Sequence, residues 1–336
     1  MERQSRRVRH TLACVAATAV LACGEARDAT TIAPVNLTGA GATFPYPLYR
    51  AWFSEYAAHA RVRINYFSVG SAEGLRLLDE GEADFGASDL AVQPATGVRA
   101  PGCARIAVPS VRGPIAVAYN LPAASGEPTP LRFDAALLAA IFSGKVTRWN
   151  AREIAGINPG VTLPATLITV VHRGTGSGTS RAFSDFLSTS GRWKGGTVGD
   201  TTEVHWPVGL AAEGNEGVAV EVKVTIGAIG YVELAYARQN RLSVGRVKGA
   251  ANEFLSPGSE SPGYPISART WLVIDPTHVP AERGTPLVAF VRWALHEGAE
   301  QARAMEYTPI DADTVSKYDS LLKTIRFDRC AKPATR

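Results

Sequence analysis

Three glycine-rich turns carry hydroxyl side chains where a strand pattern gives way to a helix pattern. The turns cover residues 39–44, 70–74 and 174–180. Their hydroxyls belong to Thr43, Ser71, Ser177 and Thr179. A helix start offers unpaired backbone N–H groups and the positive end of the helix dipole, and glycine lets an anion approach that backbone closely. Such hydroxyls are also ordinary helix caps, so the spacing alone leaves one shared oxyanion site and three unrelated caps open.

Two charged side chains stand beside these turns. Arg173 precedes the third turn, where its guanidinium can bind two oxygens of a tetrahedral anion. At an isolated position the commoner role is a surface ion pair. Asp89 ends the short apolar segment "FGASD", where an unpaired carboxylate is costly. It therefore either caps a helix or serves a polar site.

The third turn lacks the signatures of other glycine-rich sites. A nucleotide P-loop requires lysine before its final hydroxyl residue, but here Gly178 precedes Thr179. The dinucleotide pattern requires glycine where Thr179 stands. A hydrolase elbow around Ser177 requires glycine at 175 and 179, and both are threonine. The six histidines show no paired metal spacing. We therefore expect neither a cofactor nor a metal.

The segments around the turns alternate between strand and helix patterns. Three stretches read as strand, turn and helix: "VNLTGAGATFPYPLYRAWFSEYA", "VRINYFSVGSAEGLRLLDEG" and "LITVVHRGTGSGTSRAFSDFL". The segment 104–120 predicts strands broken by Pro109 and Gly113. The segment 287–305 predicts one long amphipathic helix. This alternation predicts an α/β fold.

Length and charge restrict the class of protein. The 336 residues, 46% of them hydrophobic, can bury the core of one large or two medium domains. The formal net charge is +4, but residues 1–22 hold four arginines and one glutamate, so removing them leaves about +1. A nearly neutral chain gives no electrostatic case for binding nucleic acid or a membrane surface.

The N-terminus has the pattern of an export signal. A basic segment, "MERQSRRVRH", precedes "TLACVAATAVLA", an apolar run too short to span a bilayer. We expect residues 1–30 to be signal peptide and leader, and the mature protein to be periplasmic. The "VLAC" segment leaves two outcomes open, lipidation of Cys23 or ordinary cleavage within 26–33. No later segment is long and apolar enough for a transmembrane helix.

Two cysteines remain once Cys14 and Cys23 are assigned to the signal. They are Cys103 and Cys330, and their spacing matches no metal or redox motif. An exported protein with two cysteines favours a disulfide, and two free buried thiols are the alternative.

Several long blocks of this sequence resemble the periplasmic phosphate-binding proteins of the bacterial ABC phosphate importer. The blocks follow the family's order and cover most of the chain between Leu37 and Asn240. They are "LTGAGATFPYPLY", "INYFSVGSAEG", "DFGASDLAV", "GKVTRWNAREIAGINPGVTLP", "VVHRGTGSGTSRAF", "VHWPVGLAAEGNEGVA" and "GAIGYVELAYARQN".

The resemblance implies a two-lobed type II periplasmic binding protein. Each lobe would be a mixed β-sheet flanked by helices, and two crossover strands would form a hinge near residues 107–111 and 263–267. Lobe one would comprise 35–108 with 266–332, and lobe two 109–265. Both Cys103 and Cys330 fall in lobe one, which suits a bridge between them. We expect a monomer.

The resemblance also implies a function. The protein would bind inorganic phosphate with high affinity in the periplasm and deliver it to the permease subunits of an ABC importer, by hinge closure and without catalysis. The implied phosphate-binding residues are Thr43, the backbone N–H of Phe44, Ser71, Asp89, Arg173, Ser177, Gly178 and Thr179. Asp89 would accept a hydrogen bond from protonated phosphate, whereas fully ionised sulfate would offer it only another negative charge.

Two positions depart from the family's pattern. Where relatives often carry an aspartate that pairs with the arginine, this chain has Thr175, and a family glycine in the second turn is replaced by Glu73. We expect Glu73 to point away from the anion. Two alternatives remain: a binding protein for another tetrahedral oxyanion, arsenate or sulfate, and an exported phosphate-ester hydrolase that uses Ser177 or Thr179.

Overall fold

The computed structural model describes residues 33–90, 92, 101–122, 130–193, 195, 203–258 and 263–330. The predicted signal peptide at 1–30 and Cys23, the candidate for lipidation, lie outside these residues. Within the described ranges, no helix combines the length and the apolar character needed to cross a membrane.

Strands and helices alternate along the described chain, as the sequence predicts. The first elements are β1 (Val35–Gly41), α1 (Tyr46–His59), β2 (Val62–Ser68), α2 (Ser71–Asp79), β3 (Phe85–Ser88) and β4 (Ile106–Tyr119). Next come β5 (Arg132–Phe133), α3 (Ala135–Phe142), α4 (Arg152–Ile157), β6 (Thr169–Arg173), α5 (Gly178–Ser188), β7 (Leu210–Ala212), α6 (Gly214–Val224), β8 (Ala228–Glu233), α7 (Leu234–Asn240), β9 (Ser243–Val244), β10 (Arg246–Lys248) and β11 (Phe254–Leu255). The last are β12 (Ser267–Ile274), α8 (Ala281–Leu295), α9 (Gly298–Ala304), β13 (Thr308–Pro309), α10 (Ala312–Leu322) and α11 (Phe327–Cys330).

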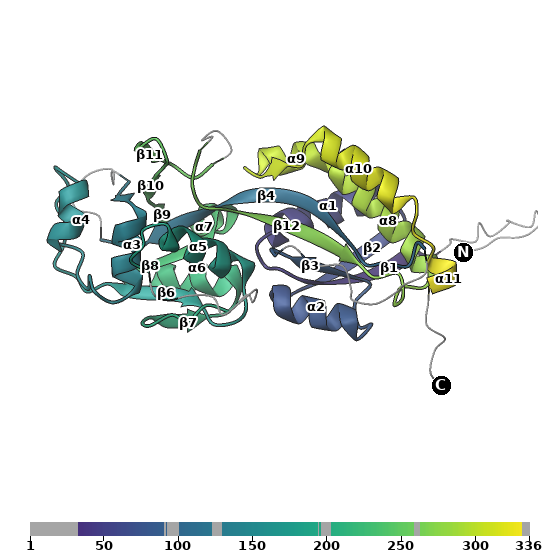
Figure 1. Cartoon of the computed structure of the whole chain (residues 1–336), viewed down its shortest axis with the longest axis horizontal. Helices are drawn as coiled ribbons and strands as arrows, with labels where there is room; N and C mark the ends of the chain where they lie inside the picture. Colours follow the sequence, from purple (N-terminus) through teal and green to yellow (C-terminus); the bar gives the residue numbers. More distant parts are fainter. Residues whose placement is uncertain are drawn as a thin grey trace, which may run out of the picture. The chain divides into compact units, whose positions relative to one another are not determined.

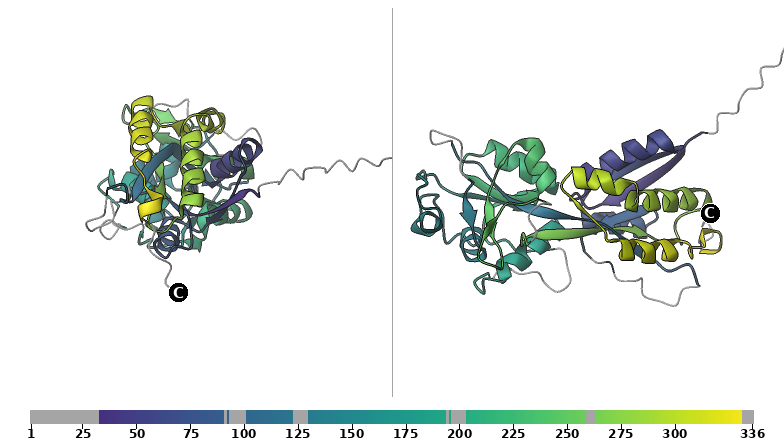
Figure 2. Two further views of the ribbon diagram at one scale, coloured as in Figure 1. Left: turned by 90° about the vertical axis from the view of Figure 1, so that its right-hand side faces the viewer. Right: turned by 90° about the horizontal axis from the view of Figure 1, so that it is seen from above.

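One long strand, β4, belongs to two parts of the main sheet. The strand order is β2-β1-β3-β12-β4-β8-β6-β7, with β9 and β13 also paired to β4. β4 pairs with β12 as far as Pro114 and with β8 from Ile115 onward. We call the part with β1, β2, β3, β12 and β13 sheet A, and the part with β6, β7, β8 and β9 sheet B. Figures 1 and 2 show β4 and β12 running side by side.

The predicted break within β4 was wrong, because the strand runs unbroken through Pro109 and Gly113. The register with β12 shifts between Thr270 and Trp271, which is opposite Pro109. An irregularity of this kind removes the need for the N–H that proline lacks. Gly113 has a packing reason, since a Cβ there would lie 2.9 Å from the Phe44 ring.

Sheet A is covered by helices on both faces. Strands β1, β2 and β3 are parallel, and in Figure 1 α2 lies on one face while α1 and α8 lie on the other. Along β2 the side chains of Val62, Ile64 and Tyr66 alternate with exposed residues, as predicted. Aromatic rings fill the space under α1, where Phe53 packs on Phe85 and Phe290.

The predicted long helix over 287–305 was also wrong, because the structure has two helices there. α8 ends at Leu295, His296 leaves the helical conformation, and α9 begins at Gly298. The buried Trp52 explains the break, since its Nε1 donates to the Gly298 carbonyl at 2.9 Å. A side chain at 298 would collide with the same ring. The chain therefore turns to pack against Trp52, and periodicity alone does not reveal that contact.

A disulfide joins Cys103 to Cys330, with their Cα atoms 5.3 Å apart. Cys103 precedes β4, and Cys330 is the last residue of α11. The bond therefore ties the C-terminal helix to the segment that leads into the shared strand. The predicted lobe boundaries remain a prediction; β4 changes its partner between Pro114 and Ile115, six residues beyond the predicted boundary between 108 and 109.

Candidate anion-binding site

The three glycine turns of the sequence meet at the carboxyl ends of parallel strands. Thr43 follows β1, Ser71 begins α2 after β2, and Asp89 follows β3. These strands are parallel neighbours, so their ends share one edge of sheet A. In sheet B, Arg173 is the last residue of β6, and Ser177 caps the N-terminus of α5.

Asp89 lies where the start of α5 meets sheet A. It is 7% exposed, and its backbone N–H donates to the Ser71 hydroxyl at 3.2 Å. Gly178 packs so closely that a Cβ there would lie 2.2 Å from the Asp89 Cβ. Only glycine allows the first turn of α5 to approach this far. The second and third glycine turns therefore meet at Asp89.

Arg173 connects the third turn to the first. Its side chain is buried, and its Nη1 donates to the Ser177 hydroxyl at 2.9 Å and to the Thr43 hydroxyl at 3.3 Å. None of the described carboxylates forms an ion pair with it. Burial lowers the pKa of Arg173, while nearby Tyr231 and Asp89 oppose that shift. The guanidinium is thus a buried cation whose neighbours are mostly hydroxyls.

Three buried polar atoms of this cluster have no hydrogen-bond partner. They are Asp89 Oδ1, Arg173 Nε and Thr179 Oγ1. A buried polar group without a partner costs about 1–3 kcal/mol, and more when it is charged. The cluster thus combines an unused acceptor, an unused cationic donor and an unused hydroxyl. A partly protonated oxyanion requires both kinds of group, an acceptor for its proton and donors for its charged oxygens.

Burial raises the pKa of Asp89 to about 7. The Thr270 hydroxyl, the charge of Arg173 and the Thr179 hydroxyl each act in the opposite direction, but burial outweighs them. The Thr179 hydroxyl acts by its proximity, because it forms no hydrogen bond of ordinary geometry. The carboxyl group is therefore poised between its neutral and charged forms near neutral pH.

The remaining predicted residues belong to the same cluster. The Ser177 hydroxyl accepts the Ser180 N–H at 3.2 Å, as an N-cap does. Phe44 is fully buried, and its carbonyl accepts the Tyr307 hydroxyl at 3.3 Å. Thr179 lies one residue into α5 and is also fully buried. The structure thus brings all eight predicted residues together.

The sequence did not reveal two further residues that contact Thr43. Asn215 donates to the Thr43 hydroxyl at 2.8 Å from Nδ2, and the Tyr236 hydroxyl donates to the Thr43 carbonyl at 2.7 Å. A signal for Asn215 did exist, because "EGNEG" after β7 is a fourth glycine turn before a helix. Tyr236 had none, since its contact depends on how sheets A and B meet.

The two departures from the family pattern lie outside the polar cluster. Glu73 is on the exposed side of α2, where it pairs with Arg76 at 2.6 Å, so the prediction that it points away is confirmed. Thr175 is exposed. The side chain of His172 stacks on Trp206, with ring centroids 5.6 Å apart. It is therefore not part of the polar cluster, as strand alternation predicts.

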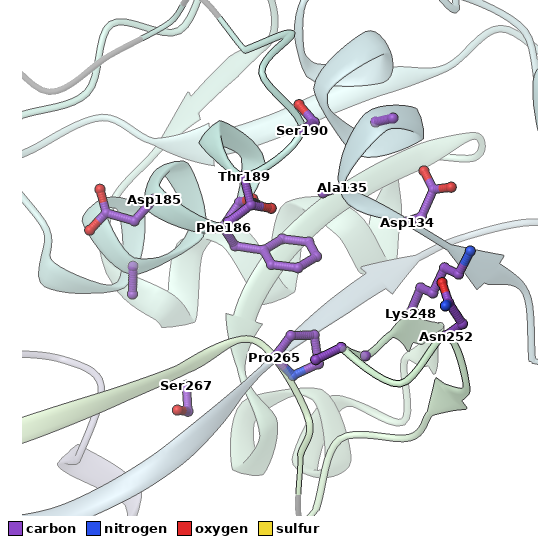
Figure 3. A pocket seen from close by; sticks show the side chains of 14 residues that line it. Asp134, Ala135, Asp185, Phe186, Thr189, Ser190, Lys248, Asn252, Pro265 and Ser267 are labelled. Carbon is purple, nitrogen blue, oxygen red and sulfur yellow. Dashed lines mark hydrogen bonds between the residues drawn. The ribbon is translucent and has the colours of Figure 1, made fainter.

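A separate cavity of about 840 Å³ lies between α3, α5 and the start of β12. Figure 3 shows the Phe186 ring inside it, with Asp134 and Lys248 on one side and Asp185 on the other. Two carboxylates against one lysine disfavour an anion there. A smaller cavity of about 280 Å³ touches the loop that follows Arg173. Within the described residues, no group of histidines, cysteines and carboxylates could hold a metal ion.

The chain combines a mixed α/β fold with a buried polar cluster at the carboxyl ends of its parallel strands. The family model of the PBP superfamily domain matches residues 25–297 of this chain. By this match and by its curated relatives, the chain belongs to the PstS phosphate-binding protein family of that superfamily.

The curated relatives match most of the chain. The phosphate-binding protein PstS of Xylella fastidiosa strain 9a5c is 36% identical, over 85% of this chain and 84% of its own length. The PstS protein of Haemophilus influenzae is 35% identical, over 86% of this chain and 93% of its own length. Each alignment extends across sheets A and B alike.

Solved structures share the fold. A phosphate-binding protein from Stenotrophomonas maltophilia superposes with a TM-score of 0.64 at 18% identity, covering 85% of this chain and 93% of its own. A high affinity periplasmic phosphate-binding protein, solved with bound phosphate, gives a TM-score of 0.67 at 20% identity, covering 85% and 93%.

Proposed function

We propose that this protein binds inorganic phosphate and hands it to the permease of an ABC importer. The observation that carries the proposal is the set of three buried atoms without partners, Asp89 Oδ1, Arg173 Nε and Thr179 Oγ1. The names of the curated relatives point to the same ligand.

Phosphate suits this set better than sulfate does. Near neutral pH phosphate still carries a proton, which it donates to Asp89, while its charged oxygens accept from Arg173 and Thr179. Sulfate has no proton to donate, so it would either face the negative charge of Asp89 or require that carboxyl group, whose pKa is about 7, to take up a proton. A lost partner for a buried acceptor costs about 1–3 kcal/mol, and more when the acceptor is charged, which corresponds to roughly fivefold to 140-fold or more in affinity. Arsenate has the shape and protonation of phosphate, so these contacts do not discriminate against it.

Hinge closure follows from where the groups lie. Thr43, Ser71 and Asp89 stand on sheet A, whereas Arg173, Ser177 and Thr179 stand on sheet B. An anion that contacts both sets is bound fully only when the two sheets are together, so it shifts the protein toward its closed form. The hinge is the part of β4 around Pro114 and Ile115, where its partner changes from β12 to β8.

We propose a transport role rather than catalysis for the site hydroxyls. The Ser177 oxygen accepts from Ser180 and from the cationic Arg173, which lowers its nucleophilicity rather than raising it. Export through the N-terminal signal and action as a monomer in the periplasm belong to the same proposal.

Isothermal titration calorimetry tests the proposal. We expect one phosphate per chain to bind at pH 8.5, where Asp89, with its pKa of about 7, is almost fully charged, and sulfate to bind at least tenfold more weakly. Equal affinity for the two anions, or no heat with millimolar phosphate, would refute it. Turnover of a chromogenic phosphate ester, abolished by Ser177→Ala, would favour the hydrolase instead.

A further inference from the structure

Thr43 is held by side chains from the opposite side of the candidate site. Asn215 lies on α6, and its backbone N–H and Nδ2 both donate to the Thr43 hydroxyl oxygen, at 3.1 and 2.8 Å. Arg173 Nη1 is a third donor to the same oxygen, at 3.3 Å. Because three donors surround this oxygen, the hydroxyl hydrogen must point away from all of them.

A further hydrogen bond fixes the orientation of the Asn215 amide group. Its Oδ1 accepts the backbone N–H of Glu233, the last residue of β8, at 2.9 Å. The amide nitrogen must therefore face Thr43. Asn215 is 1% exposed, so water does not compete for these bonds. The amide links a rigid strand of sheet B to the loop that follows β1 in sheet A.

Tyr236 forms a second connection to the same loop. Its hydroxyl hydrogen is shared between the Thr43 carbonyl at 2.7 Å and Glu216 Oε1 at 2.9 Å. Glu216 Oε1 also accepts the Ser68 hydroxyl at 3.1 Å, and Ser68 is the last residue of β2. We call Asn215, Glu216 and Tyr236 the Thr43 latch. All three come from α6 and α7, and they contact the loop after β1 and the end of β2 in sheet A.

We propose that Asn215 and Tyr236 are positioning residues, which hold the Thr43 loop against α6 and α7 and so stabilise the closed form independently of the anion. The inference rests on the proposed function for its consequence, which is slow release of phosphate. The latch uses none of the three unpartnered atoms, so it complements the anion contacts. Opening the site requires the latch to break, and its loss accelerates dissociation more than it slows association.

Two measurements on wild type, Tyr236→Phe and the double variant Asn215→Ala/Tyr236→Phe test the latch. Small-angle X-ray scattering without phosphate is expected to give a larger radius of gyration for the double variant than for wild type. Stopped-flow kinetics are expected to show about tenfold faster phosphate dissociation for Tyr236→Phe, equivalent to about 1.4 kcal/mol. Its association rate should change less than threefold.

Tyr119→Phe is the matched control, because it removes a buried hydroxyl that bonds the Leu131 N–H at 3.2 Å, away from the Thr43 loop. It should leave both measurements at the wild-type values. The inference is overturned if the double variant scatters like wild type without phosphate, or if Tyr236→Phe releases phosphate no faster than Tyr119→Phe. If wild type binds no phosphate but the double variant still expands, the proposed function fails and the latch stands.

Discussion

Replacing Asp89 by asparagine should stabilise the unliganded protein while it weakens discrimination between anions. The substitution keeps the size of the side chain and removes its charge. In the wild type, burial raises the pKa of this carboxyl group from 3.8 to about 7. The folded protein therefore binds more protons than the unfolded chain between these two values, and its stability falls as pH rises through that interval.

The size of the effect follows from the pKa difference. At 1.36 kcal/mol for each pH unit, the raised pKa of Asp89 costs the unliganded protein about 4 kcal/mol at pH 8 and about 2 kcal/mol at pH 5. The asparagine variant carries no such cost. Its gain in stability over wild type should therefore be larger at pH 8 than at pH 5, and should vanish near pH 3.

Denaturant unfolding at pH 5 and pH 8, with and without phosphate, measures both consequences. Without phosphate we expect the variant to be the more stable protein, by a margin that grows with pH. Calorimetry on the same variant should show the ratio of phosphate to sulfate affinity falling at least tenfold, since the amide no longer repels a fully ionised anion. A variant that is less stable than wild type at both pH values, or that keeps the full preference for phosphate, would refute this reasoning.

Two further predictions follow from the packing. Gly178→Ala places a Cβ about 2.2 Å from the Asp89 Cβ, so it should lower phosphate affinity at least tenfold in calorimetry. Gly156→Ala is the control, because its new Cβ meets nothing within 4 Å, and it should leave phosphate affinity unchanged. Replacing both Cys103 and Cys330 by serine should lower the free energy of unfolding by about 2–5 kcal/mol while phosphate affinity stays within twofold; an unchanged denaturation midpoint would contradict the stabilising role of the bond.

Short-range patterns predicted the elements and the turns. Each glycine turn follows an apolar strand and precedes an amphipathic helix, a pattern that is complete within about twenty residues. The roles of Asp89 and Arg173 could not be predicted from such patterns, because a helix cap explained Asp89 equally well and a surface ion pair is the commoner role for an isolated arginine. The resemblance to a known family connected the three turns. Their placement in one buried cluster then came from the structure.

The features that the sequence analysis predicted wrongly or did not reveal depend on contacts between residues far apart in sequence. The continuity of β4 depends on how it pairs with β12, and the break after α8 depends on Trp52, which lies more than 240 residues before Gly298. Neither β12 nor Trp52 lies in the stretch of sequence from which the prediction was made. Tyr236 was missed for the same reason, since its hydroxyl finds Thr43 only when α7 packs against the loop after β1.

A crystal structure of the protein with phosphate tests the central claim most directly. We expect one anion with oxygens within about 2.5–3.2 Å of Asp89 Oδ1, Arg173 Nε and Thr179 Oγ1, so that each of these atoms gains the partner it lacks. Phosphate bound elsewhere, for example beside Lys248 in the cavity of Figure 3, with the three atoms still unpaired, would contradict the account.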